Sequence, residues 1–235
     1  MTLNREQILR EMGLGPVWKL RAAPVEEVAA AEPLREIVPV IAAAPPLAPM
    51  SWDELAPAVA ACRRCRLCEA RKQAVLGVGD VNADWLFVGE GPGAEEDQRG
   101  EPFVGQAGKL LDNMLAAIGL KRGQNLYIAN AVKCRPPENR TPAPEEAAAC
   151  RPYLERQIEL IQPKLIVALG RPAAQTLLQS EIKIAAARGK LHEYHGIPLI
   201  VTYHPAYLLR TLADKAKAWE DLCFMRWTMA EQKGG

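Results

Sequence analysis

The chain has 235 residues, of which 49% are hydrophobic and 24% are charged, and its net charge is +1. These values are typical of a globular protein with a sizeable core, and they exclude a chain that is polyanionic or polycationic throughout. They do not exclude a nucleic-acid partner, because such binding depends on local clusters of Lys and Arg. No apolar run reaches the roughly 18 residues that suggest a membrane span, so we expect none.

The N-terminal stretch MTLNREQILREMGLG carries charges through its apolar part and does not resemble a secretory signal. We therefore expect an intracellular, reducing location, close to the nucleoid if the partner is DNA. In such a compartment the six cysteines favour metal or redox chemistry over disulfides.

Three regions follow one another along the chain. Residues 1–21 contain a short amphipathic pattern at 4–21, which predicts a helix. Residues 22–50 are rich in Ala and Pro, a composition typical of a semi-rigid, poorly ordered linker. The globular domain is expected at 51–235, and its first helix should begin at Ser51, because Ser-Trp-Asp-Glu is a favourable N-cap and first turn.

Within this domain apolar runs alternate with helical periodicity. Buried strands are predicted at 84–88, 126–129, 164–169 and 199–203, and helices at 105–119, 144–162, 171–179 and 211–231. This alternation indicates an α/β fold with a mostly parallel sheet and helices on both faces.

Polar or flexible residues come directly after each predicted strand: Glu90, Asn130, Gly170 and His204. Ligands of open α/β sheets bind outside the carboxyl ends of the strands. These residues are therefore expected to converge on one edge of the sheet and to form a site there.

Four cysteines indicate a metal centre. Cys62 and Cys65 form a Cys-x-x-Cys pair, and Cys134 and Cys150 follow further along the chain. Four thiolates suit either Zn²⁺ or a [4Fe–4S] cluster, and the spacing does not choose between them. The alternative is that Cys134 and Cys150 are simply buried thiols. Cys68 is a fifth candidate ligand.

The loop from Gly89 to Gly93 (GEGPG) follows a predicted strand, and its glycines allow the backbone to approach a ligand closely. It does not match a dinucleotide fingerprint, because Pro92 interrupts the spacing and the acidic residues at 95–97 would repel a pyrophosphate. Phe103 lies just downstream, where it could stack on a flat ring or simply belong to the core.

The segment that begins at His204 combines a possible ligand-facing imidazole with apolar residues. Leu208 and Leu209 are either ordinary helix hydrophobes or a wedge of the kind that enters a base stack. Basic residues gather near both pairs of cysteines: Arg63, Arg64, Arg66, Arg71, Lys72, Lys133, Arg135 and Arg140. They are either a solvated charged face or, if the cysteines share one site, a phosphate-binding patch.

The segments CRRCRL, GEGPGAEEDQRGEPFVGQAGKLL, NAVKCRPPENRTP and YHPAYLLR, in this order, closely resemble the family 4, iron–sulfur uracil-DNA glycosylases. The resemblance covers about residues 51–230. It implies the three-layer α/β/α fold of these enzymes and hydrolysis of the N-glycosidic bond of deoxyuridine in DNA, which releases free uracil and leaves an abasic site.

The resemblance also implies roles for individual residues. A [4Fe–4S] cluster would be held by Cys62, Cys65, Cys134 and Cys150, with Cys68 a bystander. The Gly89–Gly93 loop with Glu90 would form one wall of the uracil pocket, and His204 would hydrogen-bond uracil O2. The candidates for the water-activating residue are Glu90, Glu96 and Asp97, with Glu90 favoured for its position. The uracil-binding set would be Gly89, Gly91, Gly93, Glu96, Phe103, Asn130, Leu208 and Arg210.

Within this set, Phe103 would stack on the flipped base and Asn130 would read its amide edge. Glu96 would exclude the methyl group of thymine, because Gly93 stands where some relatives have Tyr. The segment after Cys134 lacks the basic, His-containing insertion with which a related subgroup traps DNA covalently, so multiple turnover is expected.

Two other classes of function remain open: a cluster-bearing module that binds uracil or damaged DNA without cleavage, and a small redox protein. The expected partner is uracil-containing DNA, single- or double-stranded, acted on by a monomer without membrane contact. The N-terminal segment could bind a further protein that the sequence does not identify.

Overall fold

The computed structural model describes residues 49–234; the helix expected at 4–21 and almost all of the linker expected at 22–50 lie outside the described residues. The described chain forms a six-stranded sheet in the order β1-β3-β2-β4-β6-β5. Its strands are β1 (Val78–Gly79), β2 (Trp85–Gly89), β3 (Leu126–Asn130), β4 (Leu165–Leu169), β5 (Leu191–Tyr194) and β6 (Ile197–Thr202).

The four central strands β3, β2, β4 and β6 run parallel, and β1 and β5 are added antiparallel at the two edges. The predicted mostly parallel sheet is therefore confirmed, and each predicted strand corresponds to a central one. The sequence analysis missed β1 and β5. Both are short edge strands without a buried apolar run, which is the signal on which the prediction depended.

The helices are α2 (Trp52–Ala61), α3 (Leu67–Ala70), α4 (Ala94–Arg99), α5 (Gln106–Ala117), α6 (Pro144–Ile161), α7 (Arg171–Leu178), α8 (Ile184–Ala187), α9 (Pro205–Arg210) and α10 (Lys215–Gly234), with short 3₁₀ turns at Pro137–Asn139 and Leu212–Asp214. The helix predicted at 211–231 thus begins at Lys215. The one expected at Ser51 has its capping box, in which the Ser51 N–H donates to Glu54 Oε2 at 2.8 Å. In residues 49–234 no helix is long and apolar enough to cross a membrane.

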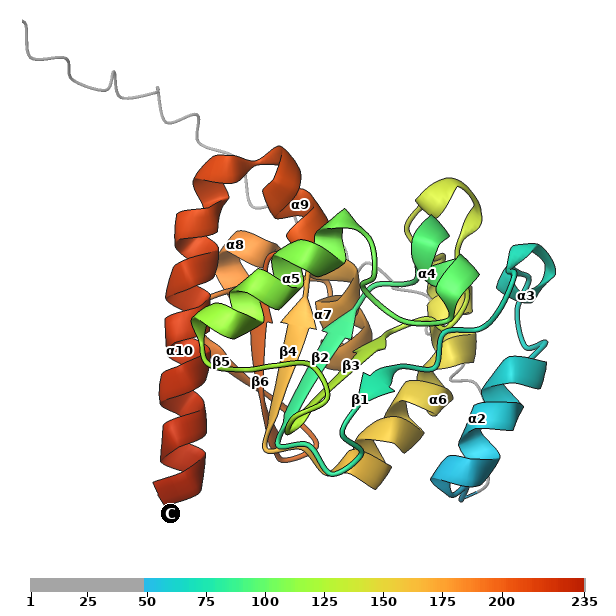
Figure 1. Ribbon diagram of the computed structural model, residues 1–235, viewed down its shortest axis with the longest axis horizontal. Helices are drawn as coiled ribbons and strands as arrows, with labels where there is room; N and C mark the ends of the chain where they lie inside the picture. The colour runs from blue at the N-terminus through green and yellow to red at the C-terminus, as the bar shows by residue number, and fades with distance from the viewer. Residues whose placement is uncertain (1–48, 235) are drawn as a thin grey trace, which may run out of the picture. The chain divides into compact units, whose positions relative to one another are not determined.

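Two hydrophobic layers cover the sheet, because alternate side chains of each strand point to opposite faces. On β2, Trp85 and Phe87 pack with residues of α5, α9 and α10, whereas Leu86 and Val88 pack with residues of α6 and α7. Figure 1 shows α5 in front of the strands and α7 behind them. The result is the three-layer α/β/α arrangement expected from the resemblance.

A third, smaller cluster lies beside the sheet. Leu55 and Val59 of α2 pack with Val132, Cys134 and residues of α6. This cluster holds the N-terminal part of the described chain against the segment that follows β3. It therefore brings the first cysteine pair near the second.

Candidate active site and cysteine site

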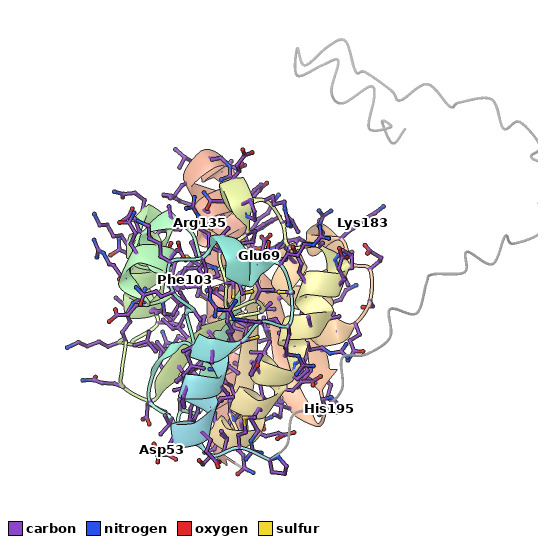
Figure 2. The ribbon with its side chains drawn as sticks, turned by 90° about the vertical axis from the view of Figure 1, so that its right-hand side faces the viewer. Asp53, Glu69, Phe103, Arg135, Lys183 and His195 are labelled. Atoms are coloured by element: carbon purple, nitrogen blue, oxygen red, sulfur yellow. The ribbon has the colours of Figure 1, made fainter. Side chains whose placement is uncertain are left out.

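A cavity of about 900 Å³ opens at the carboxyl ends of the parallel strands. Of the residues expected to form the active site, it is lined by Glu90, Gly91, Gly93, Glu96, Phe103, Asn130, His204 and Arg210. Figure 2 shows two labelled residues near this edge, Arg135 and Lys183, at the end of the molecule opposite to Asp53 and His195. The expected convergence on one edge of the sheet is therefore found.

Asn130 is the last residue of β3, and its side chain is only 2% exposed. Its Oδ1 atom has no hydrogen-bond partner within the described part of the chain. Gly89 is its register partner on β2, and a Cβ there would lie 2.4 Å from Oδ1. Gly89 therefore does not line the cavity, and its lack of a side chain leaves the space that the Asn130 amide occupies. A buried acceptor without a partner is costly unless a ligand supplies a donor.

His204 is the N-cap of α9, and its Nδ1 accepts a hydrogen bond from the backbone N–H of Ala206 at 3.1 Å. Burial lowers the pKa of His204 to about 4, the positive charge of Arg210 acts in the same direction, and Glu96 opposes both. The ring is therefore neutral at pH 7. Since Nδ1 is an acceptor, the proton of the neutral ring is on Nε2.

Phe103 is 6% exposed, belongs to the hydrophobic core and also lines the cavity. Its ring centroid lies 5.5 Å from that of His204, with an angle of 31° between the planes. Its backbone φ is 55°, an unusual value for a bulky residue. The sequence alternative of a core residue is therefore confirmed, and the ring also has access to the cavity, so stacking on a flat ring stays a prediction.

Glu96 accepts hydrogen bonds from three backbone N–H groups: Gly93 at 3.1 Å, Val104 at 3.0 Å and Gly105 at 3.1 Å. A Cβ on Gly93 would lie 2.6 Å from Glu96 Oε2, so this carboxylate fills the place beside the glycine. By accepting these three hydrogen bonds, the Glu96 carboxylate connects the loop at Gly93 to the loop at residues 104–105. Asp97, the third acidic candidate, is 2% exposed and accepts from the Lys72 N–H, and it does not line the cavity.

Glu90 is the other acidic residue that lines the cavity. Burial raises the pKa of its carboxyl group, while a hydrogen bond with the Thr141 side chain and the positive charge of Arg171 act in the opposite direction. Thr141 and Arg171 also line the cavity and were not foreseen as site residues. Their only sequence signal was position: Thr141 lies between β3 and α6, and Arg171 is the first residue of α7, which follows β4.

The expectation for Leu208 needs correction. Its side chain is 1% exposed and packs in the hydrophobic core, because α9 turns this face towards the sheet. Leu209, the other leucine considered as a wedge, is 42% exposed. If a leucine of this helix enters DNA, it is Leu209.

Four cations line the cavity, and the sequence analysis had grouped only one of them, Arg140, with other basic residues. The set is Arg140, Arg171, Lys183 and Arg210. They come from segments that are far apart in the chain, which is why no cluster was visible in the sequence. Arg140 is held by Glu146, whose carboxylate accepts from its Nη1 and Nη2 at 2.8 and 2.7 Å. Arg171, Lys183 and Arg210 therefore provide the positively charged rim suited to phosphate groups.

Cys62, Cys65, Cys134 and Cys150 line one small cavity, and Cys68 lines it too. The six cysteines are all free thiols. Among residues 49–234, no group of three or more His, Cys, Asp or Glu side chains is placed to hold a single metal ion. Zinc bound by four thiolates at 2.3 Å would need sulfurs only about 3.8 Å apart. The donor set of four cysteines around one cavity otherwise suits either Zn²⁺ or a larger iron–sulfur group.

Basic groups meet the sulfur atoms of this cavity. Arg71 Nη1 donates to Cys134 Sγ at 2.8 Å, while Nη2 donates to the carbonyl oxygens of Ala60 and Cys62 at 2.6 and 3.1 Å. The Lys133 N–H donates to Cys150 Sγ at 3.2 Å. Burial raises the pKa of Cys150 to about 12, against the effect of Lys133. Donors and positive charge aimed at buried sulfur fit an anionic thiolate-bound group.

With this geometry in place, comparison with known proteins identifies the class. The family model described as the uracil DNA glycosylase superfamily matches residues 76–223, so the chain belongs to this superfamily. Cys62 and Cys65 precede the matched residues.

The similarity extends to individual members of one group. The chain is 47% identical to the type-4 uracil-DNA glycosylase of Archaeoglobus fulgidus over 68% of this chain and 83% of the relative. It is 46% identical to that of Thermotoga maritima over 66% and 82%, and 41% identical to that of Pyrobaculum aerophilum over 74% and 92%. The resemblance drawn from the sequence motifs is thereby confirmed.

Proposed function

We propose that this uracil-DNA glycosylase binds a flipped deoxyuridine in the cavity at the carboxyl edge of the sheet and hydrolyses its N-glycosidic bond by means of Asn130, His204 and Glu90. The observation that carries the proposal is the pair of unused polar groups in one cavity. Asn130 offers an acceptor without a partner, and His204 offers a neutral imidazole whose proton is on Nε2.

The base is recognised before it is cleaved. Uracil in a duplex must leave the stack before a side chain can reach its sugar bond. In the cavity, Asn130 Oδ1 accepts from uracil N3–H and its amide NH₂ donates to O4, a pattern that cytosine reverses. The Phe103 ring covers the face of the base, and the Gly91–Gly93 backbone passes along its edge. Glu96 fills the space that the thymine methyl group would need.

Bond cleavage leaves negative charge on the departing uracil and positive charge on the sugar. The His204 Nε2–H donates to uracil O2, where that negative charge gathers, and the neutral ring makes this donation without a change of protonation state. Glu90 orients the attacking water towards the sugar carbon and favours the positive charge there. Arg171, Lys183 and Arg210 bind the phosphates on either side of the flipped nucleotide.

The four cysteines Cys62, Cys65, Cys134 and Cys150 hold a [4Fe–4S] cluster in this proposal. Their common cavity and the donors from Arg71 and Lys133 support an anionic thiolate-bound group, and the resemblance to the family 4 enzymes favours a [4Fe–4S] cluster over zinc. The cluster would join the start of the domain to the β3–α6 segment as a structural cross-link. Cys68 remains a bystander on the same cavity.

Single-turnover release of uracil from a U:G duplex tests the proposal, using anaerobically purified protein. The informative variant is His204→Asn, because Asn can still cap α9 by accepting from Ala206 while the imidazole is lost. Loss of one donor to the developing charge should lower the rate by about 10²–10³-fold with little change in DNA affinity.

A damage-binding module is the competing function, and the same assay separates it. Such a module would bind the U:G duplex tightly and release no uracil. That outcome, or an unchanged rate in His204→Asn, would contradict the proposed chemistry.

A further inference from the structure

Lys133 is a buried cation that the mechanism above does not use. It stands three residues after Asn130 and directly before Cys134, and its side chain is only 1% exposed. The ammonium group donates to the carbonyl oxygen of Asn130 at 2.8 Å and to Gln157 Oε1 on α6. Its backbone N–H donates to Cys150 Sγ. One residue therefore contacts both the base-reading residue and the cysteine site.

The second acceptor of this lysine is itself held in place. Gln157 donates through Nε2 to the carbonyl oxygen of Leu76 at 2.9 Å and to the Tyr127 hydroxyl at 3.2 Å. Tyr127 lies on β3, and Leu76 precedes β1. The Lys133 ammonium is thus the centre of a buried network that links β3, α6 and the chain leading into β1.

The hydrogen-bond acceptors of this ammonium are neutral: in the described part of the chain, no carboxylate is among them. A buried ammonium is costly unless an anion lies near it. The neighbouring groups able to supply negative charge are the sulfur atoms of Cys134 and Cys150. A cluster bound by thiolates would provide that charge, and in its absence the lysine would lack an electrostatic partner.

The position of the Asn130 amide depends on the peptide that carries it. Its neighbour across the sheet is Gly89 of β2, whose Cα lies so close that a side chain there would strike Oδ1. On its other side, the carbonyl group of Asn130 is held by Lys133. Because the amide is enclosed this tightly, a small rotation of the peptide would move Oδ1 away from a uracil N3–H.

We propose that Lys133 is a positioning residue that ties Asn130 to the cysteine site, so that a loaded cysteine site holds the base-reading amide in its productive position. This inference rests on the proposed function, since it takes Asn130 as the reader and the four cysteines as cluster ligands. Lys133 acts through Asn130 and does not touch the substrate.

The test replaces Lys133 with Met, which is apolar, keeps much of the length and leaves the backbone N–H to Cys150 in place. Ile161→Ala, at the far end of α6, is the control for loss of stability alone. We expect Lys133→Met to release uracil from a U:G duplex at least roughly tenfold more slowly, because the buried carbonyl oxygen of Asn130 loses its donor. Its DNA affinity should be unchanged. Discrimination against cytosine should fall, whereas the control should keep both.

A second readout is independent of activity. Removal of a positive charge beside the cluster should shift its midpoint potential to a more negative value, because the reduced cluster carries more negative charge. The control should leave the potential unchanged. If the potential shifts while wild-type protein releases no uracil, the proposed function fails but the link between Lys133 and the cluster survives.

If wild-type protein is active and Lys133→Met changes neither discrimination nor potential, the inference is wrong. A double-mutant cycle with Asn130→Ala gives the decisive comparison: the Lys133→Met effect on rate should vanish in that background, and full additivity would overturn the link. Should Lys133→Met fail to fold, Gln157→Met removes one acceptor of the ammonium. It should slow uracil release and lower discrimination by smaller factors while leaving the potential nearly unchanged, because the ammonium remains. Unchanged rate and discrimination would again overturn the inference.

Discussion

The backbone N–H of Ala206 donates to Nδ1 of His204 at 3.1 Å, and through this hydrogen bond the His204 side chain caps the first turn of α9. This hydrogen bond makes Nδ1 an acceptor, so the neutral imidazole carries its proton on Nε2. Burial and Arg210 keep the ring neutral by lowering its pKa to about 4. The helix cap and the choice of the protonated ring nitrogen are therefore set by the same contact.

The first prediction concerns pH. Between about pH 6.5 and pH 4, the unfolded chain binds a proton at His204 that the folded chain does not bind. The free energy of unfolding should therefore fall as pH falls through this range, and His204→Asn should lack this contribution. Denaturant unfolding of both proteins from pH 7 to pH 4 measures it. In activity assays their rate ratio should stay constant from pH 5.5 to 8; a step near pH 6.5 would contradict a neutral ring.

Asn130→Asp should weaken the preference for uracil. One amide donor is replaced by an oxygen that repels uracil O4, and the mismatch leaves buried polar groups unpaired. We expect uracil release from a U:G duplex to fall by roughly tenfold to a hundredfold, with cytosine release from a C:G duplex measured in parallel. Unaltered selectivity would show that this side chain does not read the base.

Glu96→Ala should open the space beside Gly93. The carboxylate now fills the volume that a Cβ on Gly93 would occupy, so its removal should admit a methyl group. We expect measurable thymine release from a T:G duplex and a lower melting temperature, because three backbone N–H groups lose their acceptor. Glu95→Ala, one residue earlier on α4, is the matched control; equal thymine rates in the two variants would reject the role of Glu96.

Leu209→Ala should impair the action on duplexes more than on single strands. An exposed leucine next to the cavity can enter the base stack and support extrusion, which a single strand does not require. The ratio of uracil release from double- to single-stranded substrates should therefore fall. Leu191→Ala removes a leucine that is 54% exposed on the edge strand β5, away from the cavity, and should leave the ratio unchanged. A similar loss on both substrates would argue against a wedge.

Lys183→Ala should reduce the salt dependence of DNA binding. This lysine is exposed on the rim of the cavity, and each phosphate contact contributes about 0.9 to the slope of log K against log[salt]. We expect the slope to decrease by about that amount at unchanged uracil selectivity. Lys121→Ala, in the turn before β3, is the control lysine and should keep the wild-type slope.

The sequence alone determined the central sheet and most of the cavity. Buried parallel strands appear as continuous apolar runs, and the residue that ends each run must lie at the carboxyl edge, which placed Asn130 and His204 correctly. Four motifs in a shared order then indicated the family. Short edge strands such as β1 carry no such apolar run and were missed.

Only the tertiary structure decided which side chains face the cavity and what holds them. Leu208 and Leu209 are adjacent in the sequence, and the packing of α9 on the sheet determined that the first is buried and the second exposed. The rim of Arg171 and Lys183 and the link between Lys133 and Asn130 depend on distances between atoms, which no linear pattern contains. Side-chain direction and hydrogen bonding are properties of the packed chain, because neighbours distant in sequence provide the partners.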